Sequence, residues 1–282
     1  MWNKNIETFL GCDNEYQESN IVLFGAPFDS TTSFRPGARF ASRTMRSESY
    51  GLETYSPYQD KDMEDYCYFD GGDLELCFGS SELALAKIEQ FADQIVSDGK
   101  IPFMIGGEHL VTLGNVKAVL KQYPDLHIIH FDAHTDLRED YLGVKLSHAC
   151  VIRRVWDLIG DDRIHQFGIR SGERDEFYWA KEHTNLHPFS FDGLKETVAA
   201  LKGKPVYFTI DLDVLDPSIF PGTGTPEAGG VTFMELLTAI REVCSLSIVG
   251  CDINELSPML DASGASTAVA CKVLREFLLA LS

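Results

Sequence analysis

The chain has 282 residues, of which 44% are hydrophobic, and this length and composition suit one large α/β domain with a sizeable core. Its 43 acidic residues outnumber its 24 lysines and arginines, which gives a formal net charge of −19. This charge argues against a nucleic-acid partner, which would require a basic surface, and it would attract a small cationic substrate.

Short apolar runs alternate with helical patterns along the chain. The runs that predict strands are residues 21–26, 102–105, 127–131, 164–169, 206–210 and 247–253. Apolar residues that recur every three or four positions predict helices at 83–95, 151–159 and 233–243, and a last helix at about 263–281. Such alternation is typical of a parallel sheet with helices on both faces. We expect a single domain of residues 1–282.

Two segments lack regular patterns. Residues 43–75 are rich in Tyr and Asp, and we interpret them as an irregular surface excursion with one strand at 66–69. Residues 216–230 contain four glycines and three prolines, which predicts an ordered loop without regular structure.

The cysteines and the apolar runs bear on localisation. Seven cysteines are dispersed along the chain without a CxxC pair, which favours reduced thiols in a cytoplasmic protein. The first residues do not resemble a signal peptide. No apolar run is long enough to cross a bilayer, so we expect no membrane partner.

Polar residues follow the predicted strands. Such clusters occur at 25–29, 106–109, 132–136, 168–173, 211–213 and 254–255. Because ligands bind at the carboxyl ends of strands in open parallel sheets, we expect these clusters to meet at one edge. Packing alone does not require this arrangement.

Asp132, His134 and Asp136 directly follow the strand at 127–131. Alternate residues of an extended segment face the same side, so all three could face one site. Carboxylates with some imidazole suit Mn²⁺ or another fairly hard divalent ion. The alternative is a strand end whose polar side chains cap a helix or bind water.

Asp211 and Asp213 alternate in the same way behind the strand at 206–210. A helix cap or a solvated turn is the alternative for this pair. His109 follows two glycines, which allow a tight turn and a close approach to a site. A lone histidine is usually structural, but beside two Asp motifs we favour a metal ligand.

The charges of these groups also favour a metal site. Four clustered aspartates would repel one another or take up protons, whereas two divalent ions would balance their charge. Such ions would also acidify a bridging water into hydroxide.

Three ordered motifs resemble the ureohydrolase family, which includes arginases and agmatinases. The motifs are Gly106-Gly107-Glu108-His109, Asp132-Ala133-His134-Thr135-Asp136 and Asp211-Leu212-Asp213-Val214-Leu215-Asp216-Pro217. The resemblance extends from Gly25 to about Pro258. It implies a three-layer α/β/α fold with a mostly parallel sheet, two Mn²⁺ ions per subunit, and a homo-oligomer that is a trimer or a hexamer.

The resemblance also implies a ligand set. One ion would bind His109, Asp132, Asp136 and Asp211, and the other would bind Asp132, His134, Asp211 and Asp213. Asp132 and Asp211 would then bridge the two ions.

Two further residues resemble catalytic residues of the family. His148 resembles the histidine that shuttles protons, although the following Ala149-Cys150-Val151 departs from the usual small-residue pattern, and a packing role is the alternative. Glu255 resembles the glutamate that binds the guanidinium through paired hydrogen bonds, and a helix N-terminal acid is its alternative. We expect His127 and His130, inside a strand, to be buried and hydrogen-bonded.

The family resemblance favours agmatine as the substrate, hydrolysed to putrescine and urea. The loop 137–143 lacks the Asn and Ser residues of the arginase pattern, and 25–29 and 35–39 look like agmatinases. The implied reaction is attack by a metal-bridging hydroxide oriented by Asp136. We expect Arg35 and Arg39 to pair with acidic residues in a loop or subunit contact.

Several alternatives stay open. The enzyme could act on guanidinobutyrate, another guanidino acid or arginine, or the chain could be a catalytically silent binding subunit. A deacetylase with a similar Asp and His arrangement would need one zinc ion. No GxxxxGK[ST] motif occurs, which disfavours a P-loop enzyme.

Overall fold

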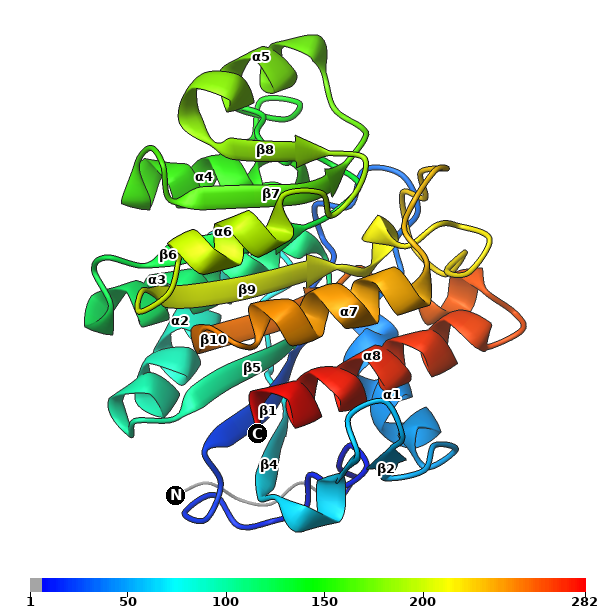
Figure 1. Cartoon of the computed structure of the whole chain (residues 1–282). Helices are drawn as coiled ribbons and strands as arrows, with labels where there is room; N and C mark the ends of the chain where they lie inside the picture. The colour runs from blue at the N-terminus through cyan, green and yellow to red at the C-terminus, as the bar shows by residue number, and fades with distance from the viewer. Residues whose placement is uncertain (1–6) are drawn as a thin grey trace.

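An eight-stranded parallel sheet forms the centre of the computed structural model, which describes residues 7–282 (Figure 1). The strand order is β4-β1-β5-β10-β9-β6-β7-β8, and every pairing is parallel. The strands are β1 (Ile21–Ala26), β4 (Tyr68–Asp73), β5 (Ile101–Gly106), β6 (His127–Phe131), β7 (Ile164–Ile169), β8 (Asn185–Pro188), β9 (Pro205–Asp211) and β10 (Ser247–Asn254).

Helices cover both faces of this sheet, and they separate the core into two apolar clusters. One cluster contains residues from α1 (Ala41–Ser49), α6 (Leu194–Ala200), α7 (Phe233–Val243) and α8 (Ala265–Leu281). The other contains residues from α2 (Ser81–Ser97), α3 (Thr112–Gln122), α4 (Val151–Ile159) and α5 (Arg174–His183). The predicted α/β/α fold is therefore confirmed.

The central strands are apolar on both faces because both faces are covered. In β9, Val206, Phe208 and Ile210 pack into the first cluster, whereas Tyr207 between them packs into the second. This alternation follows the two-residue period of a strand. Burial on both sides explains why the predicted strands are continuous apolar runs.

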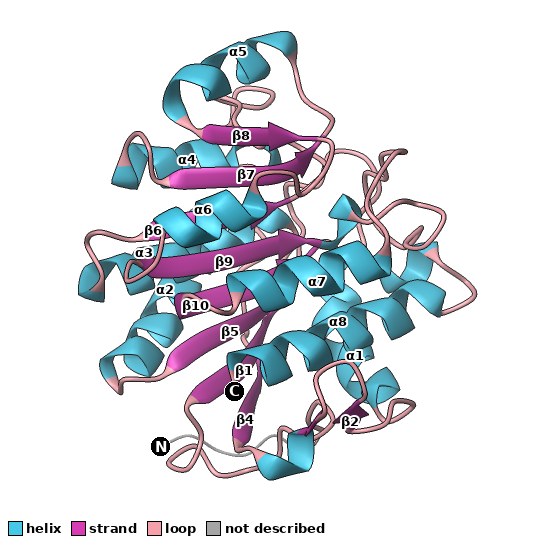
Figure 2. Cartoon of the chain, viewed as in Figure 1, coloured by secondary structure: helices cyan, strands magenta, loops and turns pink. Residues whose placement is uncertain are grey.

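The strand order brings four carboxyl ends together in the middle of the sheet. The chain passes from β5 to β6 without pairing them, and β9 and β10 later fill the gap between them. Figure 2 shows loops gathered beyond the arrowheads of these central strands. A position where the strand order changes in this way is where open parallel sheets bind ligands.

The interpretation of residues 43–75 as an irregular surface excursion was wrong, although the one strand expected within it, at 66–69, overlaps the start of β4 (Tyr68–Asp73). Helix α1 begins at Ala41, and β4 is an edge strand of the main sheet, with the short strands β2 (Tyr55–Ser56) and β3 (Lys61–Asp62) forming a hairpin between them. The inner face of α1 carries Arg46, whose Nε lies 2.7 Å from Asp70 Oδ2 of β4. A buried ion pair thus replaces the apolar pattern that would have predicted the helix.

The other sequence expectations have mixed outcomes. The loop 216–230 has no helix or strand in the structure, as predicted. Strand β8 and helices α3, α5 and α6 were not predicted. All seven cysteines are free thiols. Across residues 7–282, the structure contains no helix with the length and apolarity needed to cross a membrane.

A histidine pair away from the site predicts a pH dependence of stability. His165 Nε2 of β7 lies 3.5 Å from His127 Nδ1 of β6, and burial lowers the pKa of His165 to about 4. An unfolded histidine has a pKa near ~6.5, so between these values the unfolded chain binds more protons. Stability is therefore fully present above pH ~6.5 and falls as the pH approaches ~4.

We expect the free energy of unfolding, measured by urea titration, to decrease over this range. The slope against pH should be smaller in His165→Gln, because glutamine does not titrate. An equal slope in the two proteins would show that His165 does not contribute to the acid sensitivity.

Candidate metal centre

Six Asp and His side chains converge at the carboxyl ends of three central strands. His109 begins a short 3₁₀ helix (His109–Val111) after β5. Asp132, His134 and Asp136 follow β6, whereas Asp211 ends β9 and Asp213 lies in the 3₁₀ turn Leu212–Val214. The structure therefore brings together all six ligands that the sequence predicted.

The first group surrounds one imidazole nitrogen. His109 Nδ1 lies 3.0 Å from Asp132 Oδ2, 3.1 Å from Asp136 Oδ2 and 3.5 Å from Asp211 Oδ2. All four side chains are buried. One nitrogen and three carboxylate oxygens at this spacing could enclose a divalent ion.

The second group shares Asp132. His134 Nδ1 lies 3.4 Å from Asp132 Oδ1 and 3.0 Å from Asp213 Oδ2. Backbone amides fix the carboxylates, because His134 N donates to Asp132 Oδ1 at 2.6 Å and Asp213 N donates to Asp211 Oδ1 at 2.8 Å. The two oxygens of Asp132 thus face different groups, which suits a bridging carboxylate.

The crowding of charge shifts the pKa values of these buried groups. Burial and the neighbouring Asp213 and Asp132 raise the pKa of Asp211 well above its usual value, and burial with Asp132 raises that of Asp136 to about 7. Burial opposes the charge of His109, yet hydrogen bonds with Asp132 and Asp136 raise its pKa. Divalent cations would replace these protons, so the residues present fit a metal pair.

Hydrogen bonds fix the imidazole of His109 with Nδ1 toward the cluster. Its Nε2 lies 2.9 Å from Thr209 Oγ1, and that hydroxyl donates to Asp252 Oδ1 at 2.5 Å. Because the single hydroxyl proton goes to Asp252, Thr209 accepts from Nε2–H. Nδ1 is therefore the nitrogen available to a cation, and Asp252 orients it through Thr209.

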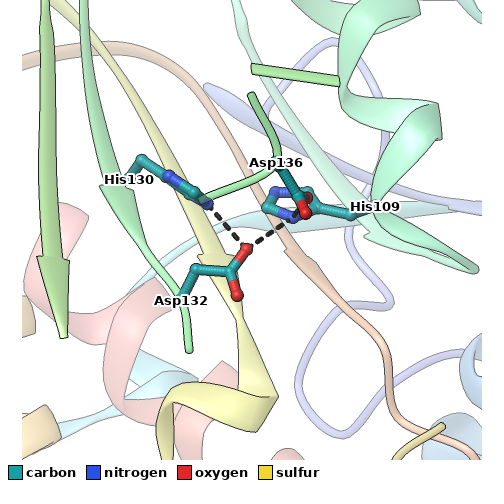
Figure 3. A group of neighbouring side chains, drawn as sticks. All are labelled: His109, His130, Asp132 and Asp136. Carbon is teal, nitrogen blue, oxygen red and sulfur yellow. Dashed lines mark hydrogen bonds and ion pairs between the residues drawn. The ribbon is translucent and has the colours of Figure 1, made fainter. Parts of the chain in front are cut away.

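His130 lies beside His109, Asp132 and Asp136, but unlike His109 it has no nitrogen available to a cation (Figure 3). Gln166 Nε2 lies 3.1 Å from His130 Nδ1, and an amide nitrogen can only donate. The proton of the neutral ring is then on Nε2, which donates to Asp132 Oδ2 at 2.8 Å. His130 thus orients Asp132 and is not available as a ligand. This agrees with its interpretation as a buried, hydrogen-bonded histidine.

A cavity of about 250 Å³ opens above the cluster. His148 and Glu255, the other two predicted site residues, both line it. Its wall and rim also include Ser33, Arg138, Tyr141, Ser171, Glu173, Glu176 and Thr225.

Glu255 is buried in the wall of this cavity. Its Oε1 accepts a hydrogen bond from His109 N at 2.7 Å, and within residues 7–282 no Lys or Arg forms an ion pair with it. Burial and the nearby Glu108 raise its pKa well above the usual value. A buried carboxylate without a cation beside it suits a cationic ligand.

Two site residues have unfavourable backbone conformations. Asp136 has a φ of 52° and Glu255 a φ of 68°, in the left-handed region that residues with a Cβ seldom adopt. Such strain is typical of functional sites and requires surrounding structure to hold it.

Sequence reasoning placed the ligands but missed the residues that orient them. Thr209, Asp252 and Gln166 lie inside apolar strands, where a charged or amide side chain is itself an unusual signal. Arg39 forms an ion pair with the acidic Asp29, as expected. Arg35 instead donates to main-chain carbonyls, with Nη2 2.9 Å from Thr223 O, so its expected acidic partner was wrong.

Comparisons with known proteins identify the family. Residues 19–280 match the model of the arginase family. The chain belongs to the arginase family. This confirms the resemblance to ureohydrolases, and the protein is a metal-dependent hydrolase of C–N bonds in linear amidines.

Relatives within the arginase family are similar over nearly the whole chain. An agmatinase from Bacillus anthracis is 48% identical over 277 residues, which cover 97% of this chain and 96% of the relative. One from Bacillus subtilis is 47% identical over 278 residues, with the same coverage of 97% and 96%. The crystal structure of a candidate agmatinase from Clostridium difficile has a TM-score of 0.93 at 56% identity, covering 95% of this chain and 99% of that one.

Metal binding should depend on Asp132, because its carboxylate faces both groups of side chains. We expect saturating Mn²⁺ to raise the melting temperature of the wild type by roughly 5 °C, because a cation binds only the folded cluster. Asp132→Asn should lose most of this increase, since it removes a charge facing both groups. Differential scanning calorimetry with and without a chelator measures the effect.

The matched control is Asp93→Asn, which changes an aspartate on the surface of α2. It should retain the Mn²⁺ response of the wild type. Equal responses of Asp132→Asn and Asp93→Asn would rule out the cluster as the binding site.

Proposed function

We propose that this protein hydrolyses agmatine to putrescine and urea with two bound Mn²⁺ ions. The observation that carries the proposal is the cavity above the Asp and His cluster, whose wall holds the buried and unpaired carboxylate of Glu255. Similarity to agmatinases supports the choice of substrate. A planar guanidinium can form paired, charge-assisted hydrogen bonds with such a carboxylate.

We assign the metal ligands by combining the geometry with the family pattern. His109, Asp136, Asp132 and Asp211 would hold one ion, and His134, Asp213, Asp132 and Asp211 the other. The distances around His109 Nδ1 and His134 Nδ1 support this division. When bound, the two ions supply the positive charge that acidifies a water molecule and stabilises charge developing on the substrate.

The side chains perform the remaining steps. Glu255 would hold the guanidinium with its carbon above the cluster, and Asp136 would orient the attacking water by accepting a hydrogen bond from it. His148 Nε2 lies 3.3 Å from Ser33 Oγ at the cavity, and as a relay it would first accept the proton that the attacking water releases and then pass it to the departing amine. Putrescine and urea then leave through the cavity mouth.

The rim of the cavity favours a substrate with a cationic far end. Arg138 could bind the carboxylate of a guanidino acid, but its Nη1 already lies 2.8 Å from Glu173 Oε1 and its Nε lies 3.7 Å from Glu176 Oε2. The guanidinium also lies over the Tyr141 ring, 4.8 Å from its centroid. One cation against two carboxylates leaves a negative rim, and the exposed Glu173 is the group that would receive the amine of agmatine.

Two expectations from the sequence remain part of the proposal. The free cysteines support a reducing, cytoplasmic location. A trimer or hexamer is expected from the family, and light scattering of the purified protein measures it.

Urea release from a panel of guanidino compounds tests the substrate. We expect Mn²⁺-loaded protein to release urea from agmatine faster than from arginine or 4-guanidinobutyrate. Faster release from 4-guanidinobutyrate would reassign the substrate to a guanidino acid. No urea from any compound would support a catalytically silent family member.

Replacing Glu255 by Gln tests the guanidinium site. The amide oxygen can still accept the hydrogen bond from His109 N, so Mn²⁺ binding should remain near the wild-type level. Loss of the charge should raise the KM for agmatine roughly tenfold to a hundredfold, because a hydrogen bond to a charged group is worth about 1.5–3 kcal/mol. Steady-state kinetics beside metal analysis separates the two effects. Metal loss with an unchanged KM would contradict this role.

A further inference from the structure

A second buried glutamate, Glu108, lies beside the metal cluster without taking part in it. Its carboxylate accepts hydrogen bonds from Thr31 Oγ1 at 2.6 Å, Thr31 N at 2.8 Å and Thr32 Oγ1 at 3.2 Å. Both threonines belong to the loop after β1, whereas Glu108 follows β5. These hydrogen bonds therefore hold the loop after β1 against the residues that follow β5.

The backbone of Gly107 makes this attachment possible. A Cβ at Gly107 would lie 1.9 Å from the carbonyl oxygen of Phe28, so only glycine allows the two segments to touch. Glu108 N donates to the same carbonyl at 2.8 Å, and Gly107 N donates to Ala26 O at 3.1 Å. The position of Thr31 is thus set by backbone contacts as well as by Glu108.

Thr31 also contacts His148. His148 N donates to Thr31 Oγ1 at 3.0 Å, and the ring Nδ1 lies 3.4 Å from the same oxygen. Burial raises the pKa of Glu108 to about 7, and while this carboxylate is ionised the single proton of the threonine hydroxyl is donated to it. Toward His148 the oxygen is therefore an acceptor, and Nδ1 must carry the proton in that contact.

The ring orientation that results suits a proton relay. Burial lowers the pKa of His148 to about 4, so the imidazole is neutral near pH 7 and has one N–H. With that proton on Nδ1, Nε2 has a free lone pair where it faces Ser33 Oγ at the cavity. Ser147 Oγ also lies 3.3 Å from Nδ1, and a hydroxyl there can either donate or accept.

We propose that Thr31, held by Glu108, is a positioning residue that keeps His148 in the tautomer with Nε2 free to accept a proton in the cavity. The proposal rests on the function proposed above, because it assumes that His148 relays protons. Under this proposal, Gly107 and Glu108 of the Gly-Gly-Glu-His motif have a role separate from metal binding. Thr31 acts only through His148, so the two residues should not have independent effects on turnover.

A double-mutant cycle tests this dependence. His148→Ala should lower kcat for agmatine by roughly a hundredfold, since a positioned acid–base group contributes 10²-fold or more. Thr31→Val should lower kcat roughly tenfold with little change in KM, whereas Thr31→Ser should restore it. In the His148→Ala background, Thr31→Val should have almost no further effect. Mn²⁺ content and melting temperature are measured for each variant.

Thr32→Val is the matched control, because Thr32 donates to the same carboxylate but, within residues 7–282, forms no hydrogen bond with His148. Its effect on kcat should be smaller than that of Thr31→Val, because the contact between Thr31 and His148 remains. Ser147→Ala tests the other neighbour of Nδ1, and it should leave kcat within about twofold of the wild type if Thr31 sets the tautomer.

The tautomer can be observed without activity. Long-range ¹H–¹⁵N correlation spectra of histidine-labelled protein show which ring nitrogen carries the proton. We expect the proton of His148 on Nδ1 in the wild type and a redistribution to Nε2 in Thr31→Val. An Nε2 proton in the wild type would overturn the proposal.

The kinetic outcomes distinguish a failure of the positioning role of Thr31 from a failure of the proton relay by His148. If His148→Ala slows turnover and Thr31→Val adds an independent loss in the double variant, only the positioning role is overturned. If His148→Ala leaves kcat unchanged, the relay itself is wrong and the positioning role falls with it.

Discussion

Repulsion between buried carboxylates is the constraint around which this molecule is organised. Four aspartates lie at the ends of adjacent strands, where the low dielectric of the core strengthens their mutual repulsion. The raised pKa values of Asp136, Asp211 and His109 favour proton uptake that would offset part of this repulsion, and two divalent cations would balance the four negative charges. The structure accordingly places histidine nitrogens toward the carboxylates and holds Asp136 in a strained conformation that a flexible loop would not maintain.

Around this centre, the residues proposed to bind the metal and those proposed to contact the substrate lie on different kinds of element. Central strands hold the proposed ligands, and Thr209, Asp252 and Gln166 orient two of the surrounding imidazoles from inside the sheet. Loops provide Glu173 at the rim and, beside His148, Thr31. Rigid strands suit a centre that must keep its geometry, whereas loops can differ between enzymes that share the same centre.

Most of the fold and all six proposed ligands could be predicted from the sequence because both depend on local spacing. Continuous apolar runs indicate the strands, the alternating Asp and His residues directly after them indicate the cluster, and the resemblance to ureohydrolases completes the ligand set. Helix α1 could not be predicted, since its inner face carries Arg46, whose partner Asp70 lies in another element. For the same reason the link between Glu108 and His148 could not be found, because its three residues come from separate segments.

The strand order also determines when this centre can exist during synthesis. Strand β6 leaves the ribosome before β7 and β8, whereas β9, with Asp211 at its end, and then β10 follow later and fill the gap between β6 and β5. A nascent chain that stops after β8 has His109 and Asp132 but lacks the strands that hold them side by side. The six proposed ligands are therefore brought together only after β9 and β10 have joined the sheet.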